Sequence, residues 1–600
     1  MLKRTAARQG LIAKWTTVRW TTVLIIGLMV GLIGIGTYGR LAGIGQKVYS
    51  FDEVRGLLRA SGSTSQEFVE RFYTGVPVTS GYVQQYQTDQ IGRDLGQALK
   101  ALAGNPEHPP LYYLLMRFSL RSHLAAASRW VAAGFSLLLL PAVYWLCVEL
   151  FYKEAGGQFG RAMGWSAIAV ISISPFQVLL AHEARQYTLW ALLTVVSSAF
   201  LLRSLRQNHY LHGQNSQSSQ STSQNNSDLR NWKLWLAYAG TALLGMYTHL
   251  FFAWTLMAHG LYVVLTERFR PTQRLLRYLL MSAGVVVGFL PWVWVVVSRS
   301  DKLSQTTRWA STFDIGLIGR SQHWLYNLGI GFIDFDWPIK WNNPFSYLIL
   351  VAVAASTWQL CRHAPKRVWL FVVLLISVST VGQILPDLLN GGRRSIVARY
   401  SLTAYLGLEL AVAYAIARLF IPDIASPIRN SLDPPRGRMR GNFINLQRLA
   451  VLSLLLGGAL SSLLITQSLG WGKGTSGVIA KTAAIINQTE QPLILTDADH
   501  PYPLSLSHKI TPDARFVLIN RDAAVITPAV KLTDAIAQLP EGQQFFIFAA
   551  SKPLVASMDA DPTVTVEVQS KQMRQAQLYS AQHSLPPSSI ADRAVGSERL

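Results

Sequence analysis

Long apolar stretches separated by short polar segments dominate the hydrophobic pattern of this chain. Several of these stretches approach or reach the roughly 20 apolar residues that a helix needs to cross the hydrocarbon core of a bilayer. Applied along the chain, this criterion predicts a polytopic α-helical membrane protein with about eleven spans. The spans are expected near residues 20–38, 125–150, 162–181, 186–203, 232–248, 250–266, 275–298, 345–361, 368–386, 400–420 and 448–468.

The connections between these spans alternate in charge. Those at residues 153–161, 203–233, 268–277, 362–367 and 418–448 are all rich in Arg and Lys. Cytoplasmic loops carry such an excess of cations, so the pattern predicts that these connections and the basic residues 1–19 are cytoplasmic. An odd number of spans then places the C-terminal segment outside. We therefore expect an integral protein of the plasma or inner membrane with an extracytoplasmic C-terminal part.

The composition agrees with this interpretation. Half of the residues are hydrophobic, only 14% are charged, and the formal net charge is +22. A charge of this size is also typical of nucleic-acid-binding proteins, but those gather their cations on one soluble face. Here the cations lie between apolar blocks, so nucleic acid is not an expected partner and membrane lipids are.

Residues 20–470 are expected to form the transmembrane domain, and three further parts differ from it. The first outer loop, residues 40–110, is amphipathic and suits helices that lie on the membrane surface. The second outer loop, residues 299–343, is rich in Trp, which favours headgroup depth. Residues 471–583 predict a small α/β domain with a mainly parallel sheet, and residues 584–600 a disordered tail. Its strands are expected at 492–496, 515–519, 544–548 and 563–568, and its helices at 478–487 and 532–539.

Asp52 and Glu53 follow the first span by about a dozen residues, next to apolar neighbours. A partly desolvated carboxylate at the membrane surface is a stronger base and suits proton removal from a hydroxyl. The alternative is a pair of merely solvated carboxylates.

A second motif, Asn-Pro-Glu-His-Pro-Pro-Leu-Tyr-Tyr, begins at Asn105. Its prolines fix the approach of the chain to an apolar helix and hold Glu107 and His108 at the interface. The motif also reads as an ordinary helix start. His249, in Tyr-Thr-His, is expected on the same side, either as a structural residue or as a ligand. Together Glu107, His108 and His249 are candidate ligands of a divalent metal cation, although their spacing matches no metal motif.

Charged residues recur at two further outer turns. Glu183, Arg185 and Tyr187 lie between two spans, where charges are expensive and should be paired. A structural pair and a substrate contact are both open. Arg393, Arg394 and Arg399 enter a span from the outer side against the positive-inside tendency, which either a lipid phosphate or ordinary anionic headgroups would compensate. Inside that span Glu409 is expected to have a buried partner.

The order of these motifs resembles that of the GT-C glycosyltransferases. It runs from Asp-Glu through His-Pro-Pro-Leu-Tyr-Tyr, Glu-Ala-Arg-Gln-Tyr and Tyr-Thr-His to Ala-Arg-Tyr. The branch it resembles most is glycosyltransferase family 39, with the protein mannosyltransferases and the bacterial lipid A aminoarabinose transferases. The resemblance covers residues 15–470 and leaves the C-terminal domain unexplained.

The resemblance implies a sugar donated from a polyprenyl phosphate in the outer leaflet, with inversion at the anomeric carbon. Asp52 would match the catalytic carboxylate and Glu53 its neighbour, and residues 107–110 the motif near the donor phosphate. Arg185, Arg394 and Arg399 are candidates to hold the leaving phosphate. The acceptor would be a lipid, a glycan or a protein. No cofactor is implied beyond the candidate divalent cation.

Two other functions are open on the sequence. A transporter or flippase of lipid-linked sugars would also use a basic cavity in a helical bundle, but transporters often carry inverted repeats, and the halves of this chain do not match. A non-catalytic membrane scaffold with a partner-binding outer domain is the second.

Overall fold

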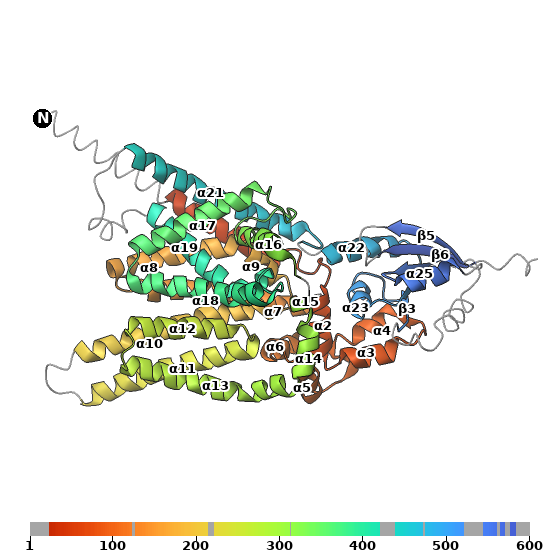
Figure 1. Cartoon of the computed structure of the whole chain (residues 1–600), viewed down its shortest axis with the longest axis horizontal. Coiled ribbons are helices and arrows are strands. Elements are labelled where there is room, and N and C mark those ends of the chain that lie inside the picture. The colour runs from red at the N-terminus through yellow and green to blue at the C-terminus, as the bar shows by residue number, and fades with distance from the viewer. Residues whose placement is uncertain are drawn as a thin grey trace, which may run out of the picture.

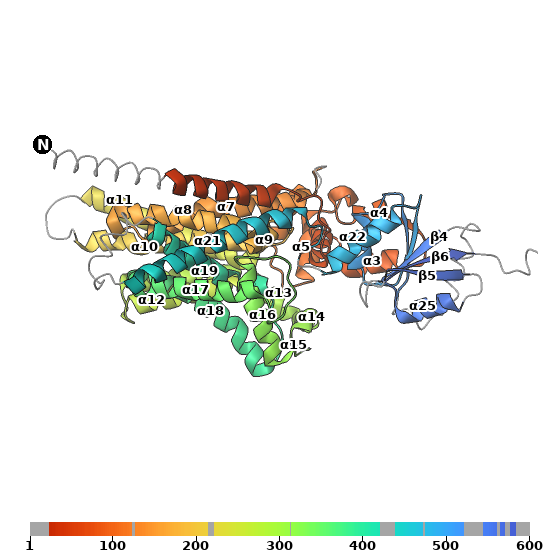
Figure 2. The same cartoon turned by 90° about the horizontal axis from the view of Figure 1, so that it is seen from above.

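In a computed structural model of the chain, a long helical bundle is joined to a C-terminal sheet domain. The structure describes residues 23–122, 126–213, 221–312, 314–420, 438–471, 474–520, 544–560, 564–570 and 577–583. The bundle helices run along the long axis of the molecule, and the sheet domain lies beyond one end (Figures 1 and 2). Residues 1–19, the predicted helix 532–539 and the predicted tail 584–600 lie outside the described residues.

The bundle consists of long, apolar helices. They are Val23–Leu41, α7 (Ala127–Leu150), α8 (Gln158–Ile173), α9 (Pro175–Ala181), α10 (Tyr187–Gly213), α11 (Ser221–Thr248), α12 (Phe252–Thr266), α13 (Gln273–Ser298), α17 (Pro344–His363), α18 (Lys366–Asn390), α19 (Leu402–Phe420) and α21 (Arg438–Gln467). The short 3-10 helices η2 (Glu154–Gly157) and η3 (Ala398–Ser401) lie between them.

The chain is a polytopic helical membrane protein, and its described part contains fewer helices that are long and apolar enough to span than the eleven spans predicted. Among the described residues, eight helices are long and apolar enough to cross a membrane, or nine if the bent pair α8–α9 counts as one span. The two predicted spans at 232–248 and 250–266 form α11 and α12, which do not meet this measure. Helix α12 has only 15 residues, and α11 begins with a polar Ser- and Asn-rich stretch. An apolar run in the sequence therefore did not always extend to a full span.

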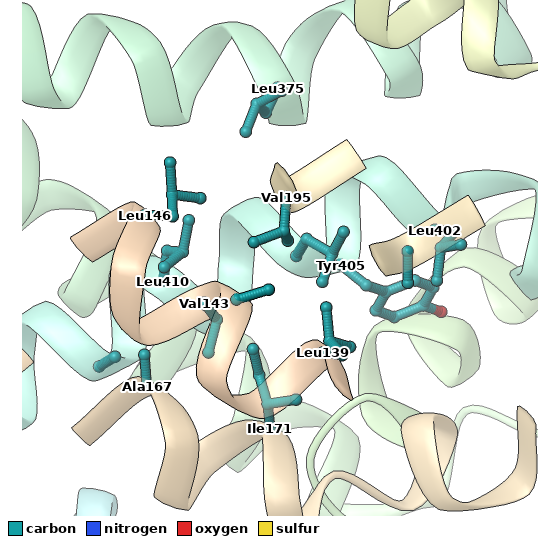
Figure 3. Close-up of a cluster of buried hydrophobic side chains, with 14 of the residues drawn as sticks. Leu139, Val143, Leu146, Ala167, Ile171, Val195, Leu375, Leu402, Tyr405 and Leu410 are labelled. Carbon is teal, nitrogen blue, oxygen red and sulfur yellow. The ribbon is translucent and has the colours of Figure 1, made fainter. Parts of the chain in front are cut away.

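Aliphatic side chains from several helices fill the centre of the bundle. Leu139, Val143 and Leu146 of α7 converge with side chains of α8, α10, α18 and α19 (Figure 3). Trp190 and Trp235 are fully buried, whereas large apolar side chains on α13 such as Trp294 remain exposed, as expected for a lipid-facing surface. Tight packing around α7 fixes the helix whose first turn reaches the candidate site described below.

A sharp bend separates α8 from α9. The two helices meet at 65°, where Pro175 follows Ser174 and cannot continue the helical hydrogen bonding. The buried guanidinium of Arg40 binds the freed carbonyls, with Nη2 2.7 Å from Ile171 O and Nη1 2.5 Å from Ser172 O. Polar partners thus replace the lost backbone bonds inside the bundle, as the bilayer environment requires.

The expected partner of Glu409 lies at the same bend. Gln177 on α9 donates from Nε2 to both carboxylate oxygens, at 3.1 and 3.3 Å, and both side chains are buried. The bend and its polar partners direct the chain after α9 toward the end of the bundle that faces the sheet domain.

The first outer loop and the second one each form short helices. The first loop and the motif after it contain α2 (Phe51–Ser61), α3 (Ser65–Phe72), α4 (Ser80–Gln85), η1 (Asp89–Ile91), α5 (Leu95–Ala103) and α6 (Leu111–Ser119). The second loop contains α14 (Ser300–Thr307), α15 (Trp309–Thr312) and α16 (Gly316–Ile330).

The C-terminal domain is a mixed sheet rather than the mainly parallel one expected. Its strands and helices are α22 (Gly474–Ile486), β2 (Leu493–Thr496), α23 (Pro501–Ser507), β3 (Arg515–Leu518), β4 (Gln544–Phe548), α25 (Lys552–Asp559), β5 (Val564–Ser570) and β6 (Leu578–His583). The strand order is β1-β3-β2-β4-β6-β5, in which β2 is parallel to β3 and β4 and the remaining pairs are antiparallel. The unpredicted strand β6 turns back from β5, which converts that edge to antiparallel pairing.

The edge strand β1 (Val78–Thr79) comes from the first outer loop. It pairs with β3, so that Val78 lies opposite Phe516. The buried side chains of Val54, Leu58 and Phe68 belong to one hydrophobic cluster with residues of the sheet domain. The apolar faces expected on the membrane surface therefore pack against the C-terminal domain, because that domain offers them a dry partner surface.

Replacing Phe68 tests this shared core. Phe68 is fully buried among Phe72, Tyr86 and His500. Truncation of a buried Phe to Ala costs about 3–5 kcal/mol, so Phe68→Ala should loosen the contact between α3 and the domain. Hydrogen–deuterium exchange should become faster in α3 and β3 and stay unchanged in the bundle.

The matched control is Val76→Ala, because Val76 lies in the same loop and is 61% exposed. Unchanged exchange in β3 of Phe68→Ala would mean that the loop and the domain are energetically independent.

Candidate functional site

The candidate site is built around the first turns of α2, at the end of the bundle that faces the sheet domain. Asp52 and Glu53 are consecutive residues of α2, yet their side chains have different surroundings. Asp52 is 30% exposed, whereas Glu53 is almost completely buried. Adjacent positions on a helix point about 100° apart, so the two carboxylates serve different neighbours.

Glu53 forms a buried ion pair with Arg129 in the first turn of α7. Arg129 donates to it from Nε at 2.8 Å and from Nη2 at 3.1 Å. The backbone N–H groups of Ser50 and Ala184 donate to the same carboxylate, at 2.8 and 2.9 Å. With these partners Glu53 joins the α2 start, α7 and the turn after α9, and its oxygens already hold four hydrogen bonds.

Arg129 also organises the chain that leads into α2. Its guanidinium donates to the carbonyl oxygens of Ile44, Lys47 and Val48, each at 3.0 Å. A cation within the predicted span 125–150 is the signal that the sequence analysis did not use, since intramembrane charges are rare and are usually paired.

Asp52 lies beside two arginines. Arg399 of η3 approaches its carboxylate with Nη2 2.7 Å from Oδ2. Arg185, from the turn between α9 and α10, donates to the backbone carbonyl of Asp52 at 3.2 Å. Residues far apart in the sequence thus bring one guanidinium group to the partly exposed carboxylate of Asp52 and a second to its backbone carbonyl.

Tyr187 lies between the same two cations. Its ring centroid is 5.7 Å from the guanidinium carbon of Arg185 and 5.6 Å from that of Arg399. The charged groups thereby rest on an aromatic face, which favours cations without neutralising them. Glu183 belongs to the same turn and also lines a cavity with Lys47, Glu53 and Arg129.

His249 closes the aromatic side of the site. It stacks on Trp190 with ring centroids 4.4 Å apart, and its Nδ1 accepts the backbone N–H of Phe251 at 3.1 Å. Burial lowers the pKa of His249 to about 3, and the nearby charges of Arg185 and Arg399 act in the same direction. His249 is therefore neutral at neutral pH, and one ring nitrogen is already engaged.

Glu107 and His108 lie just before α6, and the charges of Arg185 and Asp52 act on His108. Their Oε1 and Nε2 atoms are 4.0 Å apart. Burial, followed by the charges of Arg185 and Arg59, holds the pKa of His108 well below its ordinary range, so this side chain also is neutral. Within the described ranges no group of three or more His, Cys, Asp or Glu side chains could hold a metal ion. Glu107, His108 and His249 are thus not brought together as a metal site.

Arg393 and Arg394 lie apart from this constellation. Arg393 donates from Nε to the carbonyl oxygen of Trp309 at 2.8 Å and packs on the ring of that residue. Both follow the Gly391-Gly392 turn, and Arg393 contacts α15 of the second outer loop, whereas Arg399 reaches Asp52. Of the three predicted arginines at this entry, Arg399 is the one placed next to the carboxylate.

Comparisons with known proteins give similarity of fold at low identity. No protein-family model and no curated protein matches the chain. Among solved structures, ArnT from Cupriavidus metallidurans in the apo state is 15% identical, with a TM-score of 0.48, over 93% of this chain and 98% of that chain. The same protein bound to undecaprenyl phosphate is 14% identical, with a TM-score of 0.46 and the same coverage.

An archaeal structure is also similar. The oligosaccharyltransferase AglB from Archaeoglobus fulgidus, in complex with an inhibitory peptide and a dolichol-phosphate, is 11% identical with a TM-score of 0.43. The similarity covers 89% of this chain and 70% of that chain. Similarity at this level concerns the course of the chain and assigns neither a family nor an activity.

Neighbouring substitutions separate the roles of the two carboxylates. Glu53→Gln leaves the buried Arg129 without a counter-charge, which should cost about 3–5 kcal/mol of stability. Asp52→Asn removes a partly exposed pair and should cost less than about 1 kcal/mol. Thermal unfolding of the two purified variants in one detergent should show a clear loss of melting temperature for Glu53→Gln only. Equal melting temperatures would remove the structural assignment of Glu53.

Proposed function

We propose that this chain is a membrane glycosyltransferase that moves a sugar from a polyprenyl-phosphate donor to an acceptor hydroxyl, with inversion at the anomeric carbon. The observation that carries this proposal is the Asp52 carboxylate, partly exposed and 2.7 Å from Arg399, with Arg185 at its backbone. A base beside two phosphate-binding cations is what such a transfer requires.

In the proposed step Asp52 takes the proton of the acceptor hydroxyl as its oxygen attacks the anomeric carbon. The bond between that carbon and the phosphate oxygen breaks, and its electron pair leaves with the polyprenyl phosphate. Arg185 and Arg399 bind phosphate oxygens and stabilise the charge that develops there. Arg399 can interact with both the phosphate and Asp52, because it already lies against the Asp52 carboxylate. Glu53 then acts as a positioning residue that fixes the α2 start through Arg129.

The proposed site faces the extracytoplasmic side. Helix α7 begins with Arg129 at the site and ends near Glu149, and 24 residues at about 1.5 Å each span a bilayer core. At the far end Glu149 meets Arg203 and Arg206, which belong to the basic connections predicted inside. A lipid-linked donor would therefore enter from the outer leaflet of the plasma or inner membrane.

The order of motifs further supports a branch like glycosyltransferase family 39, within the GT-C superfamily. This is supported by the proximity of Asp52, Arg185, Tyr187 and Arg399, which come from three separate stretches of the chain. Glu107, His108 and Glu183 would shape the pocket for the sugar or its phosphate. The acceptor would be a lipid, a glycan or a protein.

The experiment compares cells that lack the gene with cells complemented by variants. Asp52→Asn should be produced at the wild-type level yet fail to transfer, since an amide cannot take the proton. Mass spectrometry of membrane lipids and surface glycans should then show a sugar-bearing polyprenyl phosphate accumulating in the deletion and in Asp52→Asn. The wild-type gene should prevent this accumulation.

Asp301→Asn is the matched control, because Asp301 is an exposed carboxylate on α14, also in an outer loop. It should behave as the wild type does. Normal lipids and glycans in cells that produce only Asp52→Asn would reject the catalytic role of Asp52.

A further inference from the structure

Buried hydrogen-bond donors without acceptors gather between α2, α6 and the turn before α10. Within the described part of the chain, Arg59 Nε, Arg185 Nε and Gln186 Nε2 are buried and have no hydrogen-bond partner, and the same holds for Nδ1 of His108. Native proteins leave few such atoms unsatisfied, because each one loses its bonds to water and gains none in return. Several of them at one place indicate a bound group that supplies acceptors.

Arg59 is the member of this group that most requires an anionic partner. It is seven residues after Asp52 on α2, so the two side chains share a helix face. The residue is only 6% exposed, and its guanidinium makes no hydrogen bond or ion pair to a described residue. Burial lowers the pKa of Arg59 to about 10, which leaves it charged at neutral pH. The charge of Glu107 favours the Arg59 guanidinium but forms no ion pair with it among the described residues, and a buried charge without a paired counter-charge is strongly unfavourable.

Tyr113 connects Arg59 with Arg185. Its ring lies against α2 at Gly56, where an added Cβ would be 3.0 Å from the ring atom Cε1. Its hydroxyl donates to Gln186 Oε1 at 2.9 Å. The Tyr113 phenol is neutral at neutral pH, because burial raises its pKa to about 12, so it does not neutralise Arg59 or Arg185, and these two cations repel each other. Neither carboxylate of the α2 start neutralises them, since Glu53 holds Arg129 and Asp52 holds Arg399.

We infer that Arg59 and Arg185, with Gln186 and the ring of His108, form a binding position for an oxyanion of the phosphate type. Two guanidinium groups and an amide supply the donors that a tetrahedral oxyanion accepts from, and the anion removes their mutual repulsion. Because His108 is neutral, it contributes a hydrogen bond and no charge, so Arg59 brings the second positive charge. No sequence motif pointed to Arg59, and its spacing from Asp52 was the available signal.

This inference deepens the proposed function and rests on it for the source of the oxyanion. The group is either the phosphate of the polyprenyl carrier or an anionic group on the acceptor, and the same donors suit both. The two sources can be separated with a lipid probe and a free one, namely undecaprenyl phosphate and inorganic phosphate.

The test measures binding to the purified full chain in detergent, by intrinsic tryptophan fluorescence for the lipid and by thermal shift for free phosphate. Arg59→Gln should weaken binding at the position by about tenfold or more, since one charge-assisted contact is lost. Arg59→Lys keeps the charge, so its affinity should lie between those of the wild type and Arg59→Gln. Arg71→Gln is the matched control, because Arg71 is exposed on the next helix, α3, and it should bind as the wild type does.

Each outcome decides between the possibilities. Weaker undecaprenyl phosphate binding by Arg59→Gln supports the position and assigns it to the carrier. A second possibility is that the wild type saturated with undecaprenyl phosphate still binds inorganic phosphate. If Arg59→Gln then binds the lipid normally but loses this inorganic phosphate, the binding position is supported and is assigned to the acceptor. Wild-type binding of both probes by Arg59→Gln overturns the inference.

The stability of the unliganded protein gives an independent readout. Removing an uncompensated buried charge should leave the melting temperature of Arg59→Gln in phosphate-free buffer equal to or above that of the wild type. A melting temperature well below that of Arg71→Gln would make Arg59 a structural residue and overturn the inference. If the wild type binds free phosphate but no undecaprenyl phosphate, the proposed donor fails while the oxyanion position stands.

Discussion

The buried ion pair between Glu53 and Arg129 is the interaction on which the candidate site depends. Its two side chains and three backbone segments hold the start of α2, the first turn of α7 and the turn after α9 together. Asp52 is the next residue along the chain, so its position follows from this anchor. The Asp52 carboxylate, which we propose as the base, can remain partly exposed because its neighbour is fixed by burial. Stability and chemistry are thus divided between consecutive residues.

A second constraint acts inside the bundle. The 65° bend between α8 and α9 leaves backbone carbonyls without helical partners, and Arg40 supplies donors for them. On the other side of the bend, Gln177 engages Glu409. These polar groups are expensive in a membrane and persist because each is satisfied. The turn that carries Arg185 to Asp52 follows at the other end of α9.

Much of the bundle was predictable, because the long spans can be recognised from their apolar composition alone. The outer region was less so. The amphipathic pattern of residues 40–110 predicted helices on the membrane surface, but only the structure shows that the sheet domain, not lipid, covers the apolar side chains of Val54, Leu58 and Phe68. Strand β1 has two residues and leaves no pattern. Its pairing is a long-range contact that local sequence does not encode.

The candidate site shows the same division. Asp52, Arg185, Tyr187 and Arg399 could be named from the sequence because charges and aromatic residues at membrane ends stand out. Their grouping, and the separation of Arg393 and Arg394 from it, depends on how distant turns approach one another. Partners of buried charges were hardest to foresee: the pairing of Glu53 with Arg129 joins positions in two different elements.

The contribution of β1 to the C-terminal sheet has a consequence for biogenesis. Ser80 Oγ donates to Ser507 O across 427 positions of sequence, and β1 beside it finds its neighbour only when β3 exists. During synthesis the apolar faces of the first outer loop therefore remain uncovered until the whole bundle and the last domain have been made. Folding of the α2 region is therefore the last step of assembly, and an incompletely synthesised chain does not contain the complete pocket.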